Sequence, residues 1–396
     1  MADGWAKVGC VSEDIGMSLA SCWPVVALGE VVDNKNSKRI PLKQSDRAAQ
    51  SGEYPYYGAS GIIDYVDEYL FEGPHLLIGE DGANLLSRST PIAFMASGKF
   101  WVNNHAHVLG ATEYINLRFL EYFFKTLDLE PYVTGSAQPK LNRKNLDRIP
   151  IPLPPIAEQK RIAAILDKAD SVRRKRKEAI ALTEELLRSA FLEMFGDPFT
   201  NPKGWEMKVL HEVLDLITYG LTVRPKYHDV GIPLVSGTQI RHGTVDLVGA
   251  PHISREDYKK LSDKSKAKCR DILFAKTGAI GHCAMLEVNQ EVAVAQNIAR
   301  LVFKEDEINP LFALHYLRTK FVQDLAKRQA KGNAVQDLQL GEMKKFPIPV
   351  PPIQTQEEFA KACLQIEQLI EHNSNEYDLT DILFNSLLQR AFRGEL

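Results

Sequence analysis

Cysteine is scarce in this sequence, and its few copies do not form close pairs. The five residues, Cys10, Cys22, Cys269, Cys283 and Cys363, are odd in number and include no C-x-x-C pair. This pattern argues against a disulfide framework and against a zinc site, and it favours reduced thiols. We therefore expect the chain to work in the cytoplasm.

Long apolar runs are also missing. No stretch of about 18 apolar residues occurs, which argues against a transmembrane helix. The first 22 residues carry acidic side chains and lack a continuous apolar stretch, so they do not resemble a secretory signal. With 396 residues, we expect two or three globular domains and no membrane partner.

Familiar catalytic and nucleotide-binding motifs are absent as well. Neither G-x-G-x-x-G nor G-x-x-x-x-G-K-[ST] occurs, so neither a dinucleotide fingerprint nor a P-loop is present. The G-x-S-x-G elbow is missing. The [DNS]-P-P-[YFW] signature of base-flipping amino-methyltransferases is missing too, since both P-P pairs precede Ile. We expect no catalytic residues in this chain and no cofactor bound by it.

Positive charge is clustered although the net charge is only −3. From Lys140 to Arg148 four cations face one acid, and from Lys160 to Lys177 eight cations face two acids. Such clusters are compatible with a phosphate-binding face. Solvated loops and helix faces would produce the same pattern.

The sequence does contain an internal repeat. The proline ladder IPIPLPPIAEQ from Ile149 returns as FPIPVPPIQTQ from Phe346, a shift of 197 positions (347 minus 150). Three further echoes keep the same order: LLIGEDGA with ILFAKTGA, NNHAHVL with AQNIARL, and WPVVALGEVV with WEMKVLHEVL. Four matches in series indicate a tandem duplication of about 197 residues.

Each copy begins with short apolar runs separated by Gly, Pro and Asn. Runs such as VVALGEVVD, FWVNNHAHVL and VAVAQNIARLVF predict strands, while PLFALHYLRTKFVQDL predicts a late helix, so each copy should be a mixed α/β domain. Because Pro is tolerated in a first helical turn, the proline ladder predicts an extended approach to a helix that starts near Pro155 and again near Pro352. We expect an α+β chain with globular domains at 1–155 and 197–352 and long helices at 156–196 and 353–396.

Both expected helices carry a repeat with alternating spacings of four and three. A 3.5-residue period held over nearly five heptads indicates a supercoiled helix pair, and we expect an antiparallel coiled coil. The apolar seam comprises Ile162, Leu166, Ala169, Ile180, Leu187 and Met194, with Phe359, Cys363, Ile366, Ile370, Tyr377, Phe384 and Leu387. LLRSAF from Leu186 matches LLQRAF better at a shift of 201 (387 minus 186), which would be a four-residue stutter.

A run of cations, RRKRK from Arg173 to Lys177, interrupts the first seam. It could contact phosphates between two half-sites. We favour the interpretation that these side chains lie in solvent or against an acidic partner. The second helix is acidic and lacks the run, so the coil would pair a basic helix with an acidic one.

Candidate binding residues come from loops that recur in both copies. Both copies keep an amide-rich strand, with Asn103 and Asn104 in one and Gln296 and Asn297 in the other, and such amides can read adenine or, equally well, satisfy buried backbone groups. His105 and His107 would share one strand face, but Asn297 and Ala299 align with them, so we expect no metal site. The DNA-binding candidates are Lys38, Arg39, Tyr57, Asn84, Arg88, Asn103, Asn104, His105, Lys140, Arg143, Lys144, Arg224, Lys226, Gln239, Arg241, Lys276, Thr277, Gln296, Asn297, Lys331 and Asn333.

The chain resembles the specificity (S) subunit of type I restriction–modification systems. The resemblance is carried over nearly the whole length by IPLPPIAEQKRIAAILDKAD, ELLRSAFLEMFGDP, LLIGEDGANLLSRS, WVNNHAHVL and LLQRAFRGEL. It implies two target-recognition domains that each read half of a split double-stranded DNA site, and a coil that sets the gap between the halves. It also implies docking of two methylation (M) subunits and, through the complex, restriction (R) subunits. S-adenosylmethionine, ATP and Mg²⁺ would then be used by the partners, and the chain would be no enzyme by itself.

Two other functions stay open at this point. One is a stand-alone regulator that binds a two-part DNA site, and the other is a coiled-coil scaffold whose domains bind protein partners. If the chain is a specificity subunit, its two loops differ in charge. The loop at Glu80 and Asp81 is acidic, whereas Lys276 and Thr277 occupy the aligned positions. We therefore expect the two domains to read different half-sites.

Overall fold

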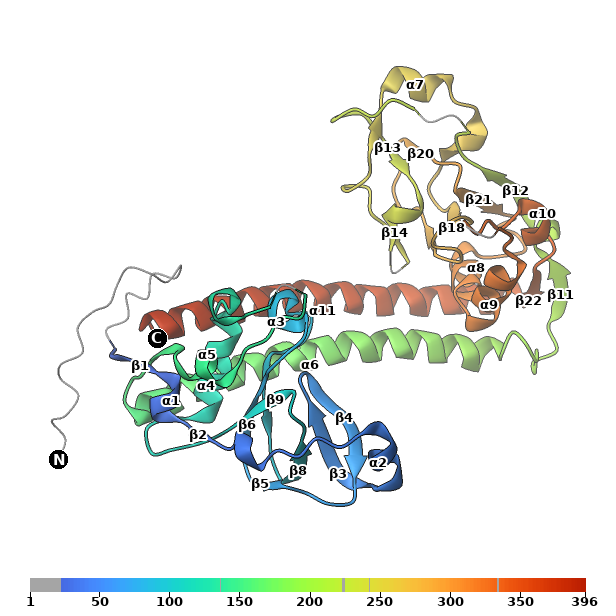
Figure 1. Cartoon of the computed structure of the whole chain (residues 1–396). Coiled ribbons are helices and arrows are strands. Elements are labelled where there is room, and N and C mark those ends of the chain that lie inside the picture. The colour runs from blue at the N-terminus through green and yellow to red at the C-terminus, as the bar shows by residue number, and fades with distance from the viewer. Residues whose placement is uncertain (1–22, 136, 223–224, 242, 333–334) are drawn as a thin grey trace. The chain divides into compact units, whose positions relative to one another are not determined.

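The computed structural model describes residues 23–135, 137–222, 225–241, 243–332 and 335–396 (Figure 1). The chain divides into two compact units, Met1–Lys177 with Asn375–Leu396, and Glu178–Ser374. Each unit takes part of both long helices, α6 (Ile156–Phe195) and α11 (Ile353–Arg393). The units therefore do not follow the four expected segments, because the helix ends pack into the cores of the globular domains. Within the described ranges, no helix combines the length and apolar content needed to span a bilayer.

The globular domain of the first unit contains two four-stranded sheets, ordered β2-β9-β6-β7 and β4-β3-β8-β5. Only β3 and β8 pair in parallel among the described strands of these two sheets. The strands are β2 (Asp33–Asn34), β3 (Ser51–Gly58), β4 (Gly61–Val66), β5 (Phe71–Glu72), β6 (His75–Gly79), β7 (Ala93–Ala96), β8 (Lys99–Val102) and β9 (Ala106–Gly110). The short helices are α1 (Leu28–Val31), η1 (Asn36–Lys38), α2 (Gln44–Ala49), α3 (Asn84–Ser87), α4 (Leu117–Thr126), η2 (Glu130–Tyr132) and α5 (Arg143–Asp147).

The globular domain of the second unit repeats this topology strand for strand, with sheets β12-β21-β18-β19 and β16-β13-β20-β17. Its strands are β12 (Leu214–Tyr219), β13 (Ile232–Val235), β16 (His252–Ile253), β17 (Lys266–Ala267), β18 (Ile272–Ala275), β19 (Cys283–Met285), β20 (Val292–Val294) and β21 (Ile298–Phe303). Its helices are η3 (Leu210–Val213), η4 (Gly237–Gln239), α7 (Arg255–Lys260), η5 (Asp263–Ser265), α8 (Pro310–Leu317), α9 (Lys320–Gln329) and α10 (Leu340–Met343). A small hairpin, β14 (Ile240–Arg241) with β15 (Thr244–Val245), is inserted after β13.

Strand register confirms the internal duplication residue by residue. Leu76 lies opposite Leu109 in the first domain, and Ile272 lies opposite Leu301 in the second. The single parallel pair also recurs, as β3 with β8 and β13 with β20. The expected pair of mixed domains, each followed by a long helix, is therefore confirmed.

The proline ladder is a paired strand in each copy. β10 (Pro150–Pro152) pairs antiparallel with β1 (Val25–Ala27), and β22 (Pro347–Val350) pairs with β11 (Glu206–Val209). Flanking bonds run from Leu28 N to Ile149 O at 2.9 Å and from Leu153 N to Pro24 O at 2.8 Å. In this register the even positions of the ladder face away from β1, so proline removes no ladder donor there. The alternation of Pro and Ile thus fits a sheet edge.

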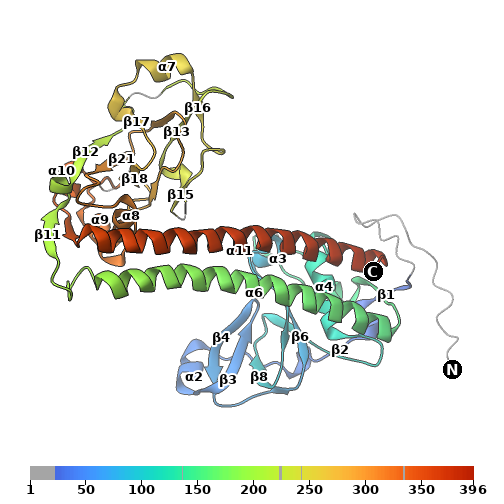
Figure 2. The same cartoon turned by 180° about the vertical axis from the view of Figure 1, so that it is seen from behind.

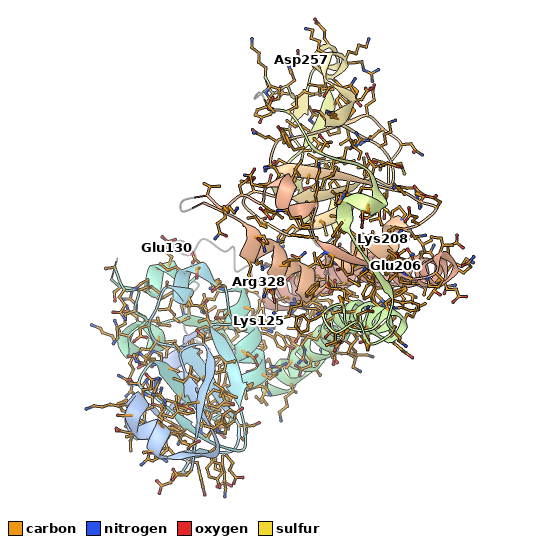
Figure 3. The ribbon with its side chains drawn as sticks, turned by 90° about the vertical axis from the view of Figure 1, so that its right-hand side faces the viewer. Lys125, Glu130, Glu206, Lys208, Asp257 and Arg328 are labelled. Atoms are coloured by element: carbon orange, nitrogen blue, oxygen red, sulfur yellow. The ribbon has the colours of Figure 1, made fainter. Side chains whose placement is uncertain are left out.

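In the first unit, the start of α6 and the end of α11 pack on α4. Ile162 and Leu166 of α6 share a hydrophobic cluster with Phe392 of α11. The Phe392 ring lies 5.2 Å from that of Phe119 and 5.4 Å from that of Phe123. Lys125, labelled in Figure 3 at the end of α4, holds its ammonium 5.7 Å from the Phe384 ring. The two helices are therefore antiparallel here.

In the second unit, the other halves of the same helices pack on α8. Phe191 and Phe195 of α6 share a cluster with Phe359 of α11 and Phe312 of α8. Ring centroids are 4.6 Å apart for Phe195 and Phe312, and 5.4 Å apart for Phe191 and Phe359. The end of α6 again meets the start of α11 (Figures 1 and 2), which confirms the antiparallel pairing.

Every residue of the expected seam is buried or half-buried. The helix starts correspond at a shift of 197, because Ile162 and Leu166 are buried like Phe359 and Cys363. At the helix ends burial fits both shifts, because Leu187 is buried and so are Phe384 and Leu388, which lie 197 and 201 positions further on. The four-residue stutter therefore stays a prediction.

Some expected elements differ in detail. VVALGEVVD is not one strand but β1, the short helix α1 and β2. PLFALHYLRTKFVQDL breaks into α8 and α9, because Thr319 has extended backbone (φ −61°, ψ 148°) and its Oγ1 donates to Tyr316 O at 2.7 Å. The β3–β4 hairpin was not expected, since its Tyr- and Gly-rich sequence lacks an alternating apolar pattern.

Candidate nucleic-acid interface

Four segments converge at one edge of each globular domain, and we call them the strand-end cluster. In the first domain the cluster consists of 58–61 after β3, 80–84 after β6, 103–105 between β8 and β9, and 134–141, without 136. In the second domain it consists of 236–239, 276–281, 295–297 and 331–338, without 333 and 334. The carboxyl ends of the parallel strands β3 and β8 lie at the same edge, which brings the first and third segments together.

Backbone hydrogen bonds join the first three segments in the first domain. Asn103 N donates to Tyr57 O at 3.1 Å, and Glu80 N donates to His105 O at 2.8 Å. Gly79 permits a close approach, because a Cβ there would lie 2.9 Å from Ala59 O. Loops positioned in this way by a rigid sheet are common binding sites.

The fourth segment is fastened to the loop after β6. Leu141 N donates to Glu80 O at 2.8 Å, and Asp81 forms an isolated β-bridge with Lys140. Lys140 also exchanges backbone bonds with Thr134, at 2.7 and 2.9 Å. Asp81 additionally holds the exposed His105, with its carboxylate 2.8 Å from Nδ1.

The Glu80 carboxylate is the electrostatic centre of the first cluster. Arg39 Nη1 donates to it at 2.7 Å, and the Lys140 ammonium lies 3.4 Å away. Burial alone would raise the pKa of Glu80, but the bond from Arg39 and the nearby cations outweigh it, so the pKa is lowered. Glu80 is therefore ionised and bound within the domain.

His107 lies beneath the cluster and does not face the same way as His105. Asn36 Nδ2 donates to His107 Nδ1 at 2.7 Å, and His107 Nε2 donates to Leu141 O at 2.7 Å. Burial lowers the pKa of His107, which suits this neutral arrangement. Among the described residues, no group of three or more His, Cys, Asp or Glu could hold a metal ion.

The second domain repeats the backbone framework. Ala295 N donates to Val235 O at 2.9 Å, and Lys276 N donates to Asn297 O at 2.9 Å. Leu338 N donates to Lys276 O at 2.8 Å, in the place of the bond from Leu141 to Glu80. Thus the same hydrogen bonds recur although most side chains differ.

The side chains at the centre of this second cluster carry the opposite charges. Lys276 Nζ lies 2.5 Å from Asp337 Oδ1, and Thr277 Oγ1 donates to the same oxygen. Burial would raise the pKa of Asp337, but these two bonds prevail and the pKa is lowered. Asp337 aligns with Lys140, and Lys276 aligns with Glu80.

The repeated architecture agrees with comparisons to known proteins. The profile of the family described as "Type I restriction modification DNA specificity domain" matches residues 21–182 and 202–378. This chain belongs to that family.

Two relatives illustrate the match within this family. A Haemophilus influenzae protein assigned as a type I restriction enzyme specificity subunit is 30% identical over 360 residues, covering 86% of this chain and 87% of that protein. The EcoBI specificity subunit of Escherichia coli is 27% identical over 289 residues, covering 65% of this chain and 60% of that protein.

A solved structure extends the likeness to the fold. The S subunit of a type I restriction–modification system from M. genitalium aligns with a TM-score of 0.62 at 15% identity, covering 96% of this chain and 97% of that one. As a member of this family, the chain is a specificity subunit, which is the non-catalytic part of a type I restriction enzyme.

The structure leaves several DNA-binding candidates of this specificity subunit exposed. Several candidates among the described residues are exposed and have side chains that do not hydrogen-bond to backbone carbonyls. They are Lys38, Asn104, His105, Lys140, Arg143, Lys144, Lys226, Gln296 and Lys331. Asn104, His105, Lys140, Gln296 and Lys331 belong to the strand-end clusters. The structure brings the first three together in the first domain and the last two together in the second.

Other candidates serve the fold in this structure. Arg88, at φ 49°, donates to the carbonyls of Phe124, Lys125 and Leu127 at the end of α4. Asn84 accepts the backbone N–H of Thr90, and Gln239 is buried and bonded to Ser236. The same holds for Arg39, Tyr57, Asn103, Lys276 and Thr277, which are buried or half-buried and engaged with neighbouring groups.

Four candidates belong to neither group. Asn297 is half-buried, and its Oδ1 has no hydrogen-bond partner. Arg241 lies in β14. Arg224 and Asn333 lie outside the described residues.

Sequence reasoning missed two parts of the cluster. The turns at 58–61 and 236–239 occupy the same place, but GASG and SGTQ show no similarity that a repeat search could use, so Gln239 was a candidate in the second turn while the first turn was missed. Asp337 was also missed, although a signal existed. Two matched segments of the repeat set Lys140 against Asp337 (a shift of 197) and Glu80 against Lys276 (a shift of 196), which is a reversal of charge at both positions.

Proposed function

We propose that the strand-end cluster of each domain reads one half of a two-part double-stranded DNA site. The observation that carries this proposal is the repeated framework: identical backbone bonds at the cluster in both copies, with different exposed side chains. A constant frame with variable side chains is what a family of sequence readers requires.

The exposed side chains differ between the copies, so the two halves of the site should differ in sequence. The exposed Asn104 and His105 occupy the turn in the first domain, and the exposed Gln296 and half-buried Asn297 occupy it in the second. Amide groups pair well with adenine in a major groove. The opposite charges of Glu80 and Lys276 give less support for different half-sites, because both are neutralised inside their own domains.

Nearby cations are suited to contact the phosphate backbone. Lys140, Arg143 and Lys144 are exposed in the first domain. Lys331 is exposed in the second, as is Arg328 on α9, labelled in Figure 3. Such contacts fix register without reading sequence, and they weaken as salt rises.

The long helices offer apolar surface for partner proteins. α11 leaves Leu379 67%, Ile382 66% and Leu383 55% exposed. Leu182 and Leu186 of α6 are 59% and 55% exposed. Apolar side chains gathered on a soluble helix suggest a protein interface. We propose that two methylation subunits dock there and that restriction subunits join through them, with S-adenosylmethionine, ATP and Mg²⁺ used by those partners in the cytoplasm.

Reconstitution with methylation subunits tests this function. The mixture should methylate a two-part sequence, found by sequencing the modified bases of DNA exposed to it, whereas neither component alone should do so. Methylation by the isolated chain would refute the assignment. Specific binding without any methylation in the mixture would favour a stand-alone regulator, and binding insensitive to salt would favour a protein scaffold.

A further inference from the structure

A charge pair of reversed polarity joins the same two segments in both domains. In the first domain the acid, Glu80, follows the central strand and the base, Lys140, lies in the later segment, with 3.4 Å between them. In the second domain the base, Lys276, follows the strand and the acid, Asp337, lies in the later segment, at 2.5 Å. The backbone bonds beside each pair are the same.

The two members of each charge pair differ in how deeply they are buried. The side chains of Glu80 and Lys276 are only 12% and 10% exposed. Those of Lys140 and Asp337 are 51% and 26% exposed. A charge that is nearly buried and already paired cannot meet a base edge without losing its partner, which would be costly.

We propose that Glu80 and Lys276, with Lys140 and Asp337, are positioning residues that lock the loop after the central strand to the later segment. The lock requires opposite charges at the two positions, but either polarity serves. The inference rests on the proposed function in one respect, namely that the locked segments face DNA.

The locked segments carry exposed side chains of the cluster. In the first domain the loop holds Asp81, which orients the exposed His105. In the second domain Asp337 forms an isolated β-bridge with Lys331, whose side chain is 70% exposed. Loss of the lock would therefore displace residues that read or grip DNA, without removing them.

Charge exchange in the second domain tests the lock. We would compare the full chain with Lys276→Glu, Asp337→Lys and the double exchange K276E/D337K. Lys264→Glu, at an exposed position on η5, is the control that matches the charge change of Lys276→Glu. Each variant, complexed with methylation subunits, would select sequences from a random DNA library, and hydrogen exchange would follow the Leu338 amide.

Each single reversal should lower discrimination by roughly tenfold at one half-site and leave the other half unchanged, since one well-placed base contact is worth about that much. The Leu338 amide should exchange faster in the singles and return toward the wild-type rate in the double exchange. Lys264→Glu should change neither measurement. If a reversal fails to fold, as judged by thermal unfolding, Asp337→Asn replaces it.

Single reversals with wild-type discrimination and wild-type exchange would overturn the proposal. A double exchange as defective as the singles would overturn it too, because the charges would then act individually. A wild-type complex that selects no two-part sequence would count against the proposed function. The exchange rate at Leu338 would still decide whether the lock exists.

Discussion

Two buried glutamines fasten the long helices to their domains. Gln159 Oε1 accepts from Asn116 N at 2.8 Å, and its Nε2 donates to the carbonyls of Tyr114 and Pro154, both at 2.9 Å. Gln356 repeats this arrangement with Asn309, Glu307 and Pro351. Each amide thus satisfies groups of the proline segment and of the domain in the first turn of a helix.

Replacing Gln159 with Leu should destabilise the chain. The change leaves buried backbone groups of Asn116, Tyr114 and Pro154 without partners, and each such group costs about 1–3 kcal/mol, so we expect a loss of about 3 kcal/mol in the free energy of unfolding. Urea denaturation measures it. Gln365→Leu, at an exposed position of α11, is the matched control. Equal midpoints for the two variants would contradict the anchoring role.

The buried His107 should make the stability of the first domain sensitive to acid. Burial lowers its pKa below the ordinary value of 6.5, so the folded state binds fewer protons than the unfolded state. Stability should therefore be full above pH 6.5 and fall as the pH drops below it, by up to about 1.4 kcal/mol per pH unit for one proton. His315 should act the same way in the second unit, since burial lowers its pKa as well.

The measurement is urea denaturation between about pH 7.5 and about pH 5.5. His107→Gln should show a shallower pH dependence than the wild type, whereas His211→Gln, at an exposed position, should not. A wild-type slope in His107→Gln would show that this imidazole is not the titrating group.

For single residues, the sequence predicted which positions lie in the strand-end cluster better than it predicted what each side chain does there. It singled out Asn103, His105 and Lys140, and the structure brings them into one cluster. It also offered Lys276 as a DNA contact, because a cation in a Gly-containing loop looks available. The partner that buries it, Asp337, lies 61 positions away, and no local pattern reports such a pairing.

Among the elements, the seam of the coil was readable because its spacing is local. Helix periodicity fixes which side chains share a face, so burial along α6 and α11 follows from the heptads. The β3–β4 hairpin was not readable, because its Tyr- and Gly-rich sequence lacks an alternating apolar pattern, and β8, which pairs with β3 on its other side, is distant in the chain. The polar residues of the seam also form ion pairs between the two helices.

The cations of RRKRK that lie in the seam are held by acids of the first unit. Arg173 donates to Asp381 at 2.9 Å and to Asp170 at 2.7 Å, and its guanidinium lies 4.4 Å from the Phe384 ring centroid. Arg176 pairs with Glu376. These contacts agree with the favoured interpretation, in which the run meets an acidic partner.

Arg173→Leu should therefore destabilise the helix pair, because Asp170, which is 5% exposed, loses one of its cations. We expect a loss of about 1–2 kcal/mol in the free energy of unfolding, between the values for exposed and buried pairs. Lys175→Leu, at an exposed position of the same run, is the control for urea denaturation. A larger loss in the control, or a large loss of DNA affinity without destabilisation in Arg173→Leu, would favour direct phosphate contact.

For the whole molecule, the decisive feature is that α6 and α11 are continuous helices of 40 and 41 residues shared by both units. Removing one heptad from each helix at matched positions, 174–180 and 373–379, keeps the 3.5-residue period on both sides of the deletion. Seven residues shorten a helix by about 10 Å, or about three base pairs of duplex.

If the coil sets the gap between half-sites, the shortened chain should methylate the same two half-sites with about three fewer base pairs between them. Sequencing of modified bases after reconstitution gives both quantities at once. A one-residue deletion in each helix should instead abolish specific methylation, because it rotates the seam out of register. An unchanged gap, or altered half-sites, would separate the coil from spacing and leave the two domains as readers whose distance is set by the partner subunits.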